Sequence, residues 1–265
     1  MTELSRSYQI NMPQMAMGGL SESWLFKELG DLHWVLITEG LGEPSSMLAD
    51  ANGARLYPTF TRIQIRSSVP FTGYRENDRL DLTGKIARYG SSYFFSDWRL
   101  EAGDRHIDAR LMSTFTKRSA EESNVALLKG QPVIRKDCAI PVLDEQPAFA
   151  AAFREHRAAN ERPATFETDY VLQPNYDING VRLLYFAAYP MIADLCEARG
   201  EENPVDWHMN RSVIARDIFY AANCDIHDRI TYRRHASAEE RTEASLSRRS
   251  DGKLMAVVMT EIEHV

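Results

Sequence analysis

The most informative stretch of the sequence is Tyr176-Asp177-Ile178-Asn179-Gly180-Val181-Arg182-Leu183-Leu184-Tyr185-Phe186-Ala187-Ala188-Tyr189. An asparagine–glycine turn is followed there by an almost continuously apolar run that extends to Cys196 and ends before Arg199-Gly200. A run that is apolar nearly all round and closes with a basic turn and a glycine predicts a buried helix over residues 183–196. Pro190, in the middle of this run, predicts a kink in that helix.

A second run of this kind lies near the N-terminus. Apolar residues recur three or four positions apart between Glu22 and Leu36, which is the spacing of a helix with one buried face. Gly30-Asp31 interrupts the pattern. The sequence therefore predicts either one bent helix or two short ones over this range.

The remaining regular segments alternate apolar and polar residues, which predicts strands. They are residues 60–66, 79–88, 93–100 and 107–117 in the first half of the chain, and 166–172, 213–220, 229–234, 242–248 and 253–263 in the second. Turn signals join the last two segments of each group, at Glu101-Ala102-Gly103-Asp104 and at Ser250-Asp251-Gly252.

The two halves repeat one order of elements, a glycine turn, a buried helix and several antiparallel strands. Asn77-Asp78-Arg79-Leu80 has a counterpart in His227-Asp228-Arg229-Ile230, about 150 positions later. One antiparallel sheet around one long helix is the hot-dog arrangement. We therefore predict an α+β double hot dog, with two antiparallel sheets each wrapped around a long central helix. The repeats are expected at residues 1–118 and 165–265, with a linker at 119–164 that contains one short surface helix over residues 148–159.

Composition narrows the class of protein. A formal net charge of −7 argues against non-specific binding to nucleic acid. Three widely spaced cysteines fit neither a disulfide scaffold nor a cysteine-rich zinc site, and no apolar run approaches the roughly 18 residues of a membrane helix. The N-terminus lacks the apolar core of a signal peptide, so we expect a cytoplasmic protein that does not contact membranes. Without a phosphate-binding loop or a clustered set of histidines, we expect no metal, flavin or nicotinamide.

The predicted start of the second helix is the candidate site. The first N–H groups of a helix lack partners within it and carry the positive end of its dipole, so they can bind an anion or polarise a thioester carbonyl. The side-chain amide of Asn179 adds another donor. Alternatively, Asn179 only caps the helix, and Tyr185 and Tyr189 are core aromatics.

The stretch from Asp177 to Tyr189 resembles the second-repeat motif of the double-hot-dog acyltransferase/decarboxylase family of polyketide biosynthesis, the leinamycin type. The first repeat is also similar, at Met12-Pro13-Gln14-Met15, Gly19-Leu20-Ser21-Glu22 and Gly30-Asp31-Leu32-His33-Trp34. The resemblance implies an enzyme that moves the acyl group of an α-carboxyacyl-CoA such as methylmalonyl-CoA through a tyrosyl ester. The acceptor would be the phosphopantetheine thiol of an acyl carrier protein, with decarboxylation on the way and with coenzyme A thioester as a substrate rather than a cofactor.

The resemblance also implies roles for particular residues. The nucleophile would be Tyr57, in the setting Tyr57-Pro58-Thr59-Phe60, although an ordinary core tyrosine fits the same pattern. Asn179 and the N–H of Gly180 would act in catalysis by stabilising the enolate oxygen. The expected substrate-binding residues are Thr59, Val181, Arg182, Tyr185, Tyr220 and Asn223, with Thr61 as a further donor.

Arg182 departs from the family pattern, because glycine is expected there. An arginine at this point could bind the phosphates of coenzyme A or a substrate carboxylate, or it could lie on the surface. The identity of the acyl group therefore stays open.

Two alternatives remain beside the transferase. A hot-dog thioesterase acting on acyl-CoA or acyl carrier protein would need a base near the helix start, for which Asp177 or Glu22 are candidates. A non-catalytic module that binds acyl thioesters is also compatible with the sequence, and a homodimer is possible.

Overall fold

A long antiparallel sheet forms the body of the protein in the computed structural model, which describes residues 2–17, 19–119, 123–151, 156, 159–238 and 240–264. The strands lie side by side in the order β1-β5-β6-β7-β4-β10-β13-β12-β11-β9, with the short β8 beside β7. Their bounds are β1 Glu3–Gln9, β4 Tyr57–Ser67, β5 Arg79–Tyr89, β6 Tyr93–Ala102, β7 Arg105–Lys117, β8 Leu128–Gly130, β9 Phe166–Val171, β10 Arg211–Tyr220, β11 Arg229–Ala238, β12 Arg241–Arg248 and β13 Leu254–His264. A separate pair, β2 Met15–Ala16 and β3 Gly19–Leu20, precedes the first helix.

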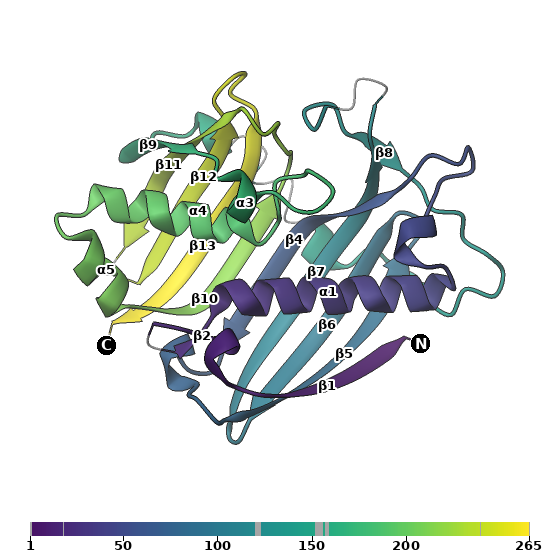
Figure 1. Cartoon of the computed structure of the whole chain (residues 1–265), viewed down its shortest axis with the longest axis horizontal. Helices are drawn as coiled ribbons and strands as arrows, with labels where there is room; N and C mark the ends of the chain where they lie inside the picture. Colours follow the sequence, from purple (N-terminus) through teal and green to yellow (C-terminus); the bar gives the residue numbers. More distant parts are fainter. Residues whose placement is uncertain are drawn as a thin grey trace.

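Two helices lie side by side against one face of this sheet, α1 (Glu22–Leu41) over the first half and α4 (Ala188–Glu197) over the second (Figure 1). Shorter helices are α2 (Ala148–Ala151), α3 (Pro174–Asp177) and α5 (Pro204–Asn210). Each half of the sheet curves around its own helix, which is the predicted double hot dog. The two half-sheets meet edge to edge, so that one continuous sheet runs through the molecule.

All nine strands predicted from alternation are present, within a few residues of the predicted bounds. The N-terminal β1, which pairs with β5 at the edge of the sheet, and the short β8 were not predicted. The predicted helix over residues 148–159 begins as α2, and residues 152–155, 157 and 158 of it lie outside the described residues. None of the helices in the described part of the chain combines the length and the apolarity needed to cross a membrane.

Helix α1 is one continuous helix, whereas the interruption at Gly30-Asp31 had also allowed two short helices. The Ser21 hydroxyl caps it by accepting the N–H of Trp24, and Gly42 closes it in a left-handed conformation. Gly30 is required by close packing, because a Cβ at this position would lie 2.2 Å from the ring of Phe186 in the other half of the chain. A glycine that weakens the helix locally is therefore what lets Phe186 approach α1.

The second helix is shorter than predicted. α4 begins at Ala188 rather than Leu183, and residues 178–187 form a non-helical loop, which we call the pre-helix loop, closed by a bridge between Ile178 and Leu184. Pro190 consequently lies in the first turn of α4, where its missing N–H has no helical partner to lose. The kink expected at Pro190 has no basis at that position.

The two half-sheets are joined through β4 and β10. These strands pair antiparallel over five residues each, from Ala215 opposite Arg66 to Phe219 opposite Arg62. Beyond the last pair the strands separate: residues 57–60 of β4 stay paired with β7, whereas the N–H of Ala221 bonds to Met255 at the start of β13. The sheet is thus split at one end of the seam between its halves.

A buried group of charges secures the other end of this seam. The guanidinium of Arg216, on β10, is 1% exposed and bonds both carboxylate oxygens of Glu22, at 2.6 and 3.1 Å. It also bonds Asp194 of α4, which pairs with Arg211 at 2.9 Å. The nearby arginines keep the pKa of the Asp194 carboxyl lowered despite its burial. These four side chains tie the start of α1, the middle of α4 and the seam strand together.

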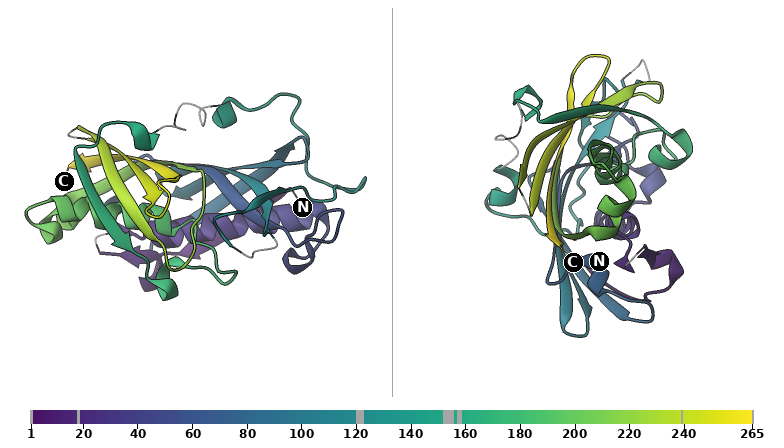
Figure 2. Two further views of the ribbon diagram at one scale, coloured as in Figure 1. Left: turned by 90° about the horizontal axis from the view of Figure 1, so that it is seen from above. Right: turned by 90° about the vertical axis from the view of Figure 1, so that its left-hand side faces the viewer.

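The linker crosses the opposite face of the sheet (Figure 2). Its Phe149 is held over the seam because the guanidinium of Arg62 lies between the rings of Phe149 and Phe219, 4.3 and 4.4 Å from their centroids. Arg62 also donates to the Phe149 carbonyl at 2.7 Å and to both oxygens of Asp217. The linker therefore forms a cover over the outer face of the seam.

Replacing Arg216 tests the buried charge group. Arg216→Met fills a similar volume but leaves the half-buried Glu22 without its cation and Asp194 with Arg211 alone, so the free energy of unfolding is expected to fall by about 3 kcal/mol. Urea denaturation followed by circular dichroism measures this loss. Arg66→Met is the matched control, since Arg66 lies on the paired seam strand in an exposed ion pair with Glu261 and is expected to cost less than about 1 kcal/mol. Equal losses for the two variants would contradict the role given to Arg216.

Candidate functional site

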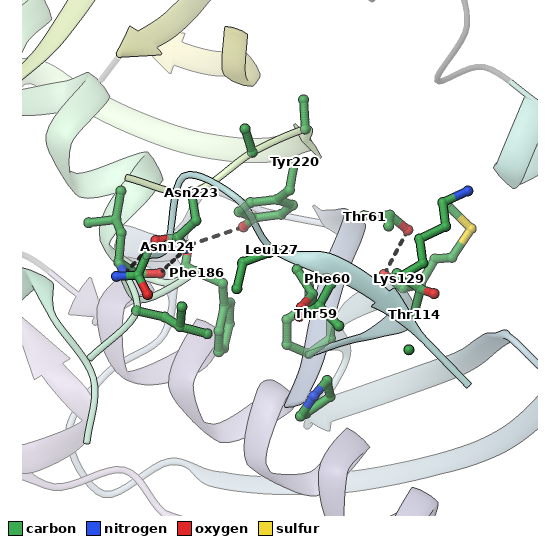
Figure 3. Close-up of a pocket in the computed structure, with 18 of the residues that line it drawn as sticks. Thr59, Phe60, Thr61, Thr114, Asn124, Leu127, Lys129, Phe186, Tyr220 and Asn223 are labelled. Atoms are coloured by element: carbon green, nitrogen blue, oxygen red, sulfur yellow. Dashed lines mark hydrogen bonds between the residues drawn. The ribbon is translucent and has the colours of Figure 1, made fainter. Parts of the chain in front are cut away.

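A cavity of about 790 Å³ occupies the place where β4 and β10 separate. One wall comes from residues 58–61 of β4 with the end of β7, and the opposite wall from residues 220–223, which begin at the last residue of β10. The pre-helix loop and parts of the linker complete the cavity (Figure 3). The cavity therefore draws on both halves of the chain and on the segment that joins them.

Aromatic rings fill the middle of the cavity. The ring of Phe186 lies 4.5 Å from that of Phe60, centroid to centroid, and Leu127 and Tyr220 lie beside them (Figure 3). Phe186 reaches this place only because Gly30 leaves room for its ring. Phe186 therefore packs in the space between the separated ends of β4 and β10.

Threonines line one end of the cavity, which we call the threonine side: Thr59, Thr61, Thr114 and Thr116. The hydroxyls of Thr59 and Thr116 bond each other at 2.7 Å, and Thr61 donates to the Met112 carbonyl at 3.2 Å. Lys129, which pairs opposite Thr116, places an ammonium at the rim. This end can bind polar atoms through hydroxyls and a cation.

Asparagines line the other end, which we call the asparagine side: Asn124, Asn179 and Asn223. Asn223 holds the pre-helix loop, because its Oδ1 accepts the N–H of Leu184 at 2.9 Å and its Nδ2 donates to the carbonyl of the same residue at 3.0 Å. Two buried tyrosines add to this hold, Tyr220 donating to the Phe186 carbonyl and Tyr189 to that of Ala222. Burial raises the pKa of both phenols well above 10, so they stay protonated donors.

Asn179 lies in the cavity wall, but not at a helix start. Its Oδ1 accepts the N–H groups of Val181 at 3.1 Å and Leu183 at 3.0 Å, so the side chain organises the turn. With the oxygen engaged in this way, the NH₂ group is the part of the amide that can donate to a ligand.

Four other predicted residues are not in the cavity lining: Gly180, Val181, Arg182 and Tyr185. The expectation that the N–H groups of Gly180 and Val181 form the positive end of a helix is wrong, because α4 begins at Ala188 and the Val181 N–H bonds to Asn179. Arg182 is exposed with a φ of 66°, a left-handed conformation that favours glycine. This explains why glycine is the residue expected there.

Tyr57 also lies outside the lining, at the first residue of β4 and next to Pro58, which does line the cavity. The guanidinium groups of Arg55 and Arg118 lie 5.2 and 5.7 Å from its ring centroid. Of the predicted site residues, the structure brings together Thr59, Thr61, Asn179, Tyr220 and Asn223 around one cavity. Tyr57 is a near neighbour of this group, and its role as a nucleophile stays a prediction.

Both proposed bases are engaged elsewhere. Glu22 is bound to Arg216, and Asp177 accepts the N–H of Gln173 at 2.6 Å and the hydroxyl of Tyr170 at 3.4 Å. Among the described residues that line the cavity, none is Asp, Glu, His or Cys. His33, on the buried face of α1, lies between the hydroxyls of Ser96 and Ser113, and burial lowers its pKa to about 3, so it is neutral. No group of three or more His, Cys, Asp or Glu side chains in the described ranges is placed to hold a metal ion.

Several lining residues were not predicted, among them Asn124, Leu127, Lys129, Thr114, Thr116 and Phe186. The first three belong to the linker, whose polar sequence has no periodicity that would place it in a site. The two threonines could have been found, because they lie on the predicted strand that pairs with Thr59.

Comparison with known proteins identifies the fold. No family model and no curated protein matches the sequence. A 12:0-ACP thioesterase from Umbellularia californica matches with a TM-score of 0.66 at 11% identity, over 99% of this chain and 98% of that chain. An acyl-ACP thioesterase from Bacteroides thetaiotaomicron VPI-5482 matches with a TM-score of 0.68 at 12% identity, over 98% of both chains. The chain therefore has the hot-dog fold of these proteins along its whole length.

The packing of Phe186 on Gly30 can be tested by a double-mutant cycle. Gly30→Ala alone is expected to lower the free energy of unfolding, by about 1–2 kcal/mol, because the new methyl group meets the Phe186 ring. In a Phe186→Ala background the same change should instead stabilise the protein, by about 0.5–1 kcal/mol, through better helix propensity. Urea denaturation of the four proteins measures the coupling. Additive effects would show that Phe186 does not rest on α1 in solution.

Proposed function

We propose that the protein binds an acyl thioester of coenzyme A or of an acyl carrier protein in the cavity at the split seam and hydrolyses it. The observation that carries this proposal is the amphipathic cavity itself, with aromatic rings in the middle and hydrogen-bonding groups at both ends. An acyl thioester is amphipathic in the same way, since its apolar acyl chain is joined through sulfur to a polar pantetheine chain.

The chemistry available is electrostatic. The NH₂ group of Asn179 is the donor that can stabilise the oxyanion formed when water attacks the thioester carbonyl. The phenol of Tyr220, which burial keeps protonated, donates to the Phe186 carbonyl and holds this residue in the middle of the cavity. Hydrolysis would thus depend on a fixed donor, with no acidic side chain among the described lining residues to act as base.

The fold supports this proposal without deciding it. Both matched structures described above are named as thioesterases that act on acyl carrier protein substrates. At 11 and 12% identity they support the architecture, and the choice of substrate for this chain depends on the cavity.

Acyl transfer is the second candidate, and the position of Tyr57 favours it. Tyr57 immediately precedes the cavity wall, and the guanidinium groups of Arg55 and Arg118 lie over its ring. An α-carboxyacyl group lying on the threonine side would meet the ammonium of Lys129. This is the route expected from the resemblance to polyketide acyltransferase/decarboxylases, with a tyrosyl ester, loss of CO₂ and transfer to a carrier protein.

Hydrolysis, acyl transfer and binding without catalysis can be told apart by their products. We expect incubation with a series of acyl-CoA thioesters and a phosphopantetheinylated carrier protein to yield a carboxylic acid and the thiol, read by intact-mass analysis and liquid chromatography. Acyl carrier protein as the product would instead establish the transferase. Binding of the thioesters without turnover would leave a non-catalytic module, and failure to bind any of them would exclude the proposal.

Two variants separate hydrolysis from transfer. Asn179→Ala is expected to lower kcat about 10²- to 10³-fold, the usual effect of removing one oxyanion donor. Tyr57→Phe keeps the ring, and in a thioesterase it should leave turnover within about twofold of the wild type. A loss of several orders of magnitude in Tyr57→Phe, together with a wild-type acyl adduct on Tyr57 in tandem mass spectra, would replace hydrolysis by the tyrosyl-ester route.

A further inference from the structure

The ring of Phe186 reaches from the pre-helix loop across to helix α1. Its tip lies against Gly30, because a Cβ built on Gly30 would be 2.2 Å from Cζ of the ring and 2.9 Å from Cε1. Phe186 lines the cavity (Figure 3), whereas the buried Gly30 is not among the lining residues. The ring therefore forms the wall that separates the cavity from this part of α1.

This wall is held in place from several directions. The ring centroid of Phe186 lies 4.5 Å from that of Phe60 and 4.7 Å from that of Tyr185. The backbone is fixed as well, since the Phe186 carbonyl accepts the hydroxyl of Tyr220 at 3.2 Å. A ring that is packed on several sides and backed by a helix keeps one rotamer. Phe186 is thus a fixed boundary of the cavity.

The apolar part of the cavity lies on the face of the sheet that carries the helices. Phe60 points to this face, because its ring centroid is 5.1 Å from that of His33 in α1. Thr59, the preceding residue of β4, points to the opposite face, and its hydroxyl bonds that of Thr116 there. Burying hydrocarbon against hydroxyls that lose their water is unfavourable. An alkyl chain therefore packs on Phe60 and Phe186, whichever way the pantetheine chain runs.

We propose, resting on the function proposed above, that Phe186 limits the length of the acyl chain that the cavity accepts. The chain packs along the ring of Phe60 and ends at the ring of Phe186, which cannot yield because α1 lies behind it. The last carbons of a longer chain have only polar groups or bulk water to lie against. Each further carbon then adds no burial, and affinity stops rising with chain length.

Gly30 sets the position of this wall. Carbon atoms in ordinary contact are about 3.5–4.0 Å apart, so a methyl group on Gly30 displaces the Phe186 ring by more than about 1 Å. The open cavity is the side that has room for the displaced ring. Gly30→Ala therefore shortens the apolar space, whereas Phe186→Ala opens it down to α1 for about four more methylene groups. The two changes shift the accepted chain length in opposite directions.

Binding of stable S-alkyl coenzyme A thioethers measures this length. For the wild type, each added methylene group should tighten Kd about fourfold up to a limiting chain length, beyond which Kd no longer tightens. Titration calorimetry with every chain length from butyl to tetradecyl locates the limit. We expect the limit to be about four carbons longer in Phe186→Ala, about two longer in Phe186→Val and about one shorter in Gly30→Ala.

Phe166→Ala is the matched control. Its ring also packs on a glycine, 3.2 Å from a Cβ built on Gly200, but Phe166 is not among the lining residues. This variant should keep the limit of the wild type. Phe186→Val and Gly30→Ala carry the test even if Phe186→Ala does not fold.

Three results would overturn the proposal. An unchanged limit in Phe186 variants that still bind the thioethers would show that another residue ends the chain, and a wild-type Kd that tightens over the whole series would show that nothing does. In both cases the proposed function would stand. If the wild type binds none of the thioethers, the proposed function fails together with the role of Phe186.

Discussion

The pairing of β4 with β10 stops at Arg62 and Phe219, and the site exists because of this. Had the two strands continued in register, their backbones would close the sheet where the cavity lies. A bulge between Phe60 and Arg62 bends β4 away, and Phe186 fills the opening against Phe60 and Gly30. The buried Arg216 group at the paired end keeps the halves joined while the other end stays open.

The two repeats share an architecture but differ where function is expected. In the first half α1 runs for 20 residues, whereas α4 has 10 and is preceded by the pre-helix loop. That loop supplies Asn179 and Phe186 to the cavity and is held by Asn223, while the corresponding part of α1 stays helical and carries Gly30. The second half therefore has a shorter helix, preceded by a loop that lines the cavity. In the first half, Phe186 packs against α1 at Gly30.

The strands and the double hot dog could be predicted because alternation and turn residues act locally, as at Gly103 and Gly252, which adopt the positive φ of tight turns. The start of α4 could not be predicted from the sequence. Its apolar run resembles a helix, but side-chain oxygens of Asn179 and Asn223 bind the backbone N–H groups of Leu183 and Leu184, and tertiary contacts override propensity. The engagement of Glu22 with Arg216 spans nearly two hundred positions, and Asn124 lies in a linker without pattern. Thr59 and Tyr220 were named from the family resemblance rather than from a pattern in the sequence, and both line the cavity.

The central claim is that the open end of the seam binds an acyl thioester, and photo-crosslinking tests it most directly. A pantetheine thioether whose alkyl chain carries a diazirine is irradiated with the wild-type protein, and the labelled peptides are identified by mass spectrometry. Labelling is expected to concentrate on residues 58–61, on residues 220–223, or on Met112, Thr114 and Thr116, which line the cavity, and to disappear when an unlabelled acyl-CoA is added in excess. Labelling that lies instead on the outer faces of α1 or α4, or that excess thioester does not suppress, would contradict the assignment of this cavity as the substrate site.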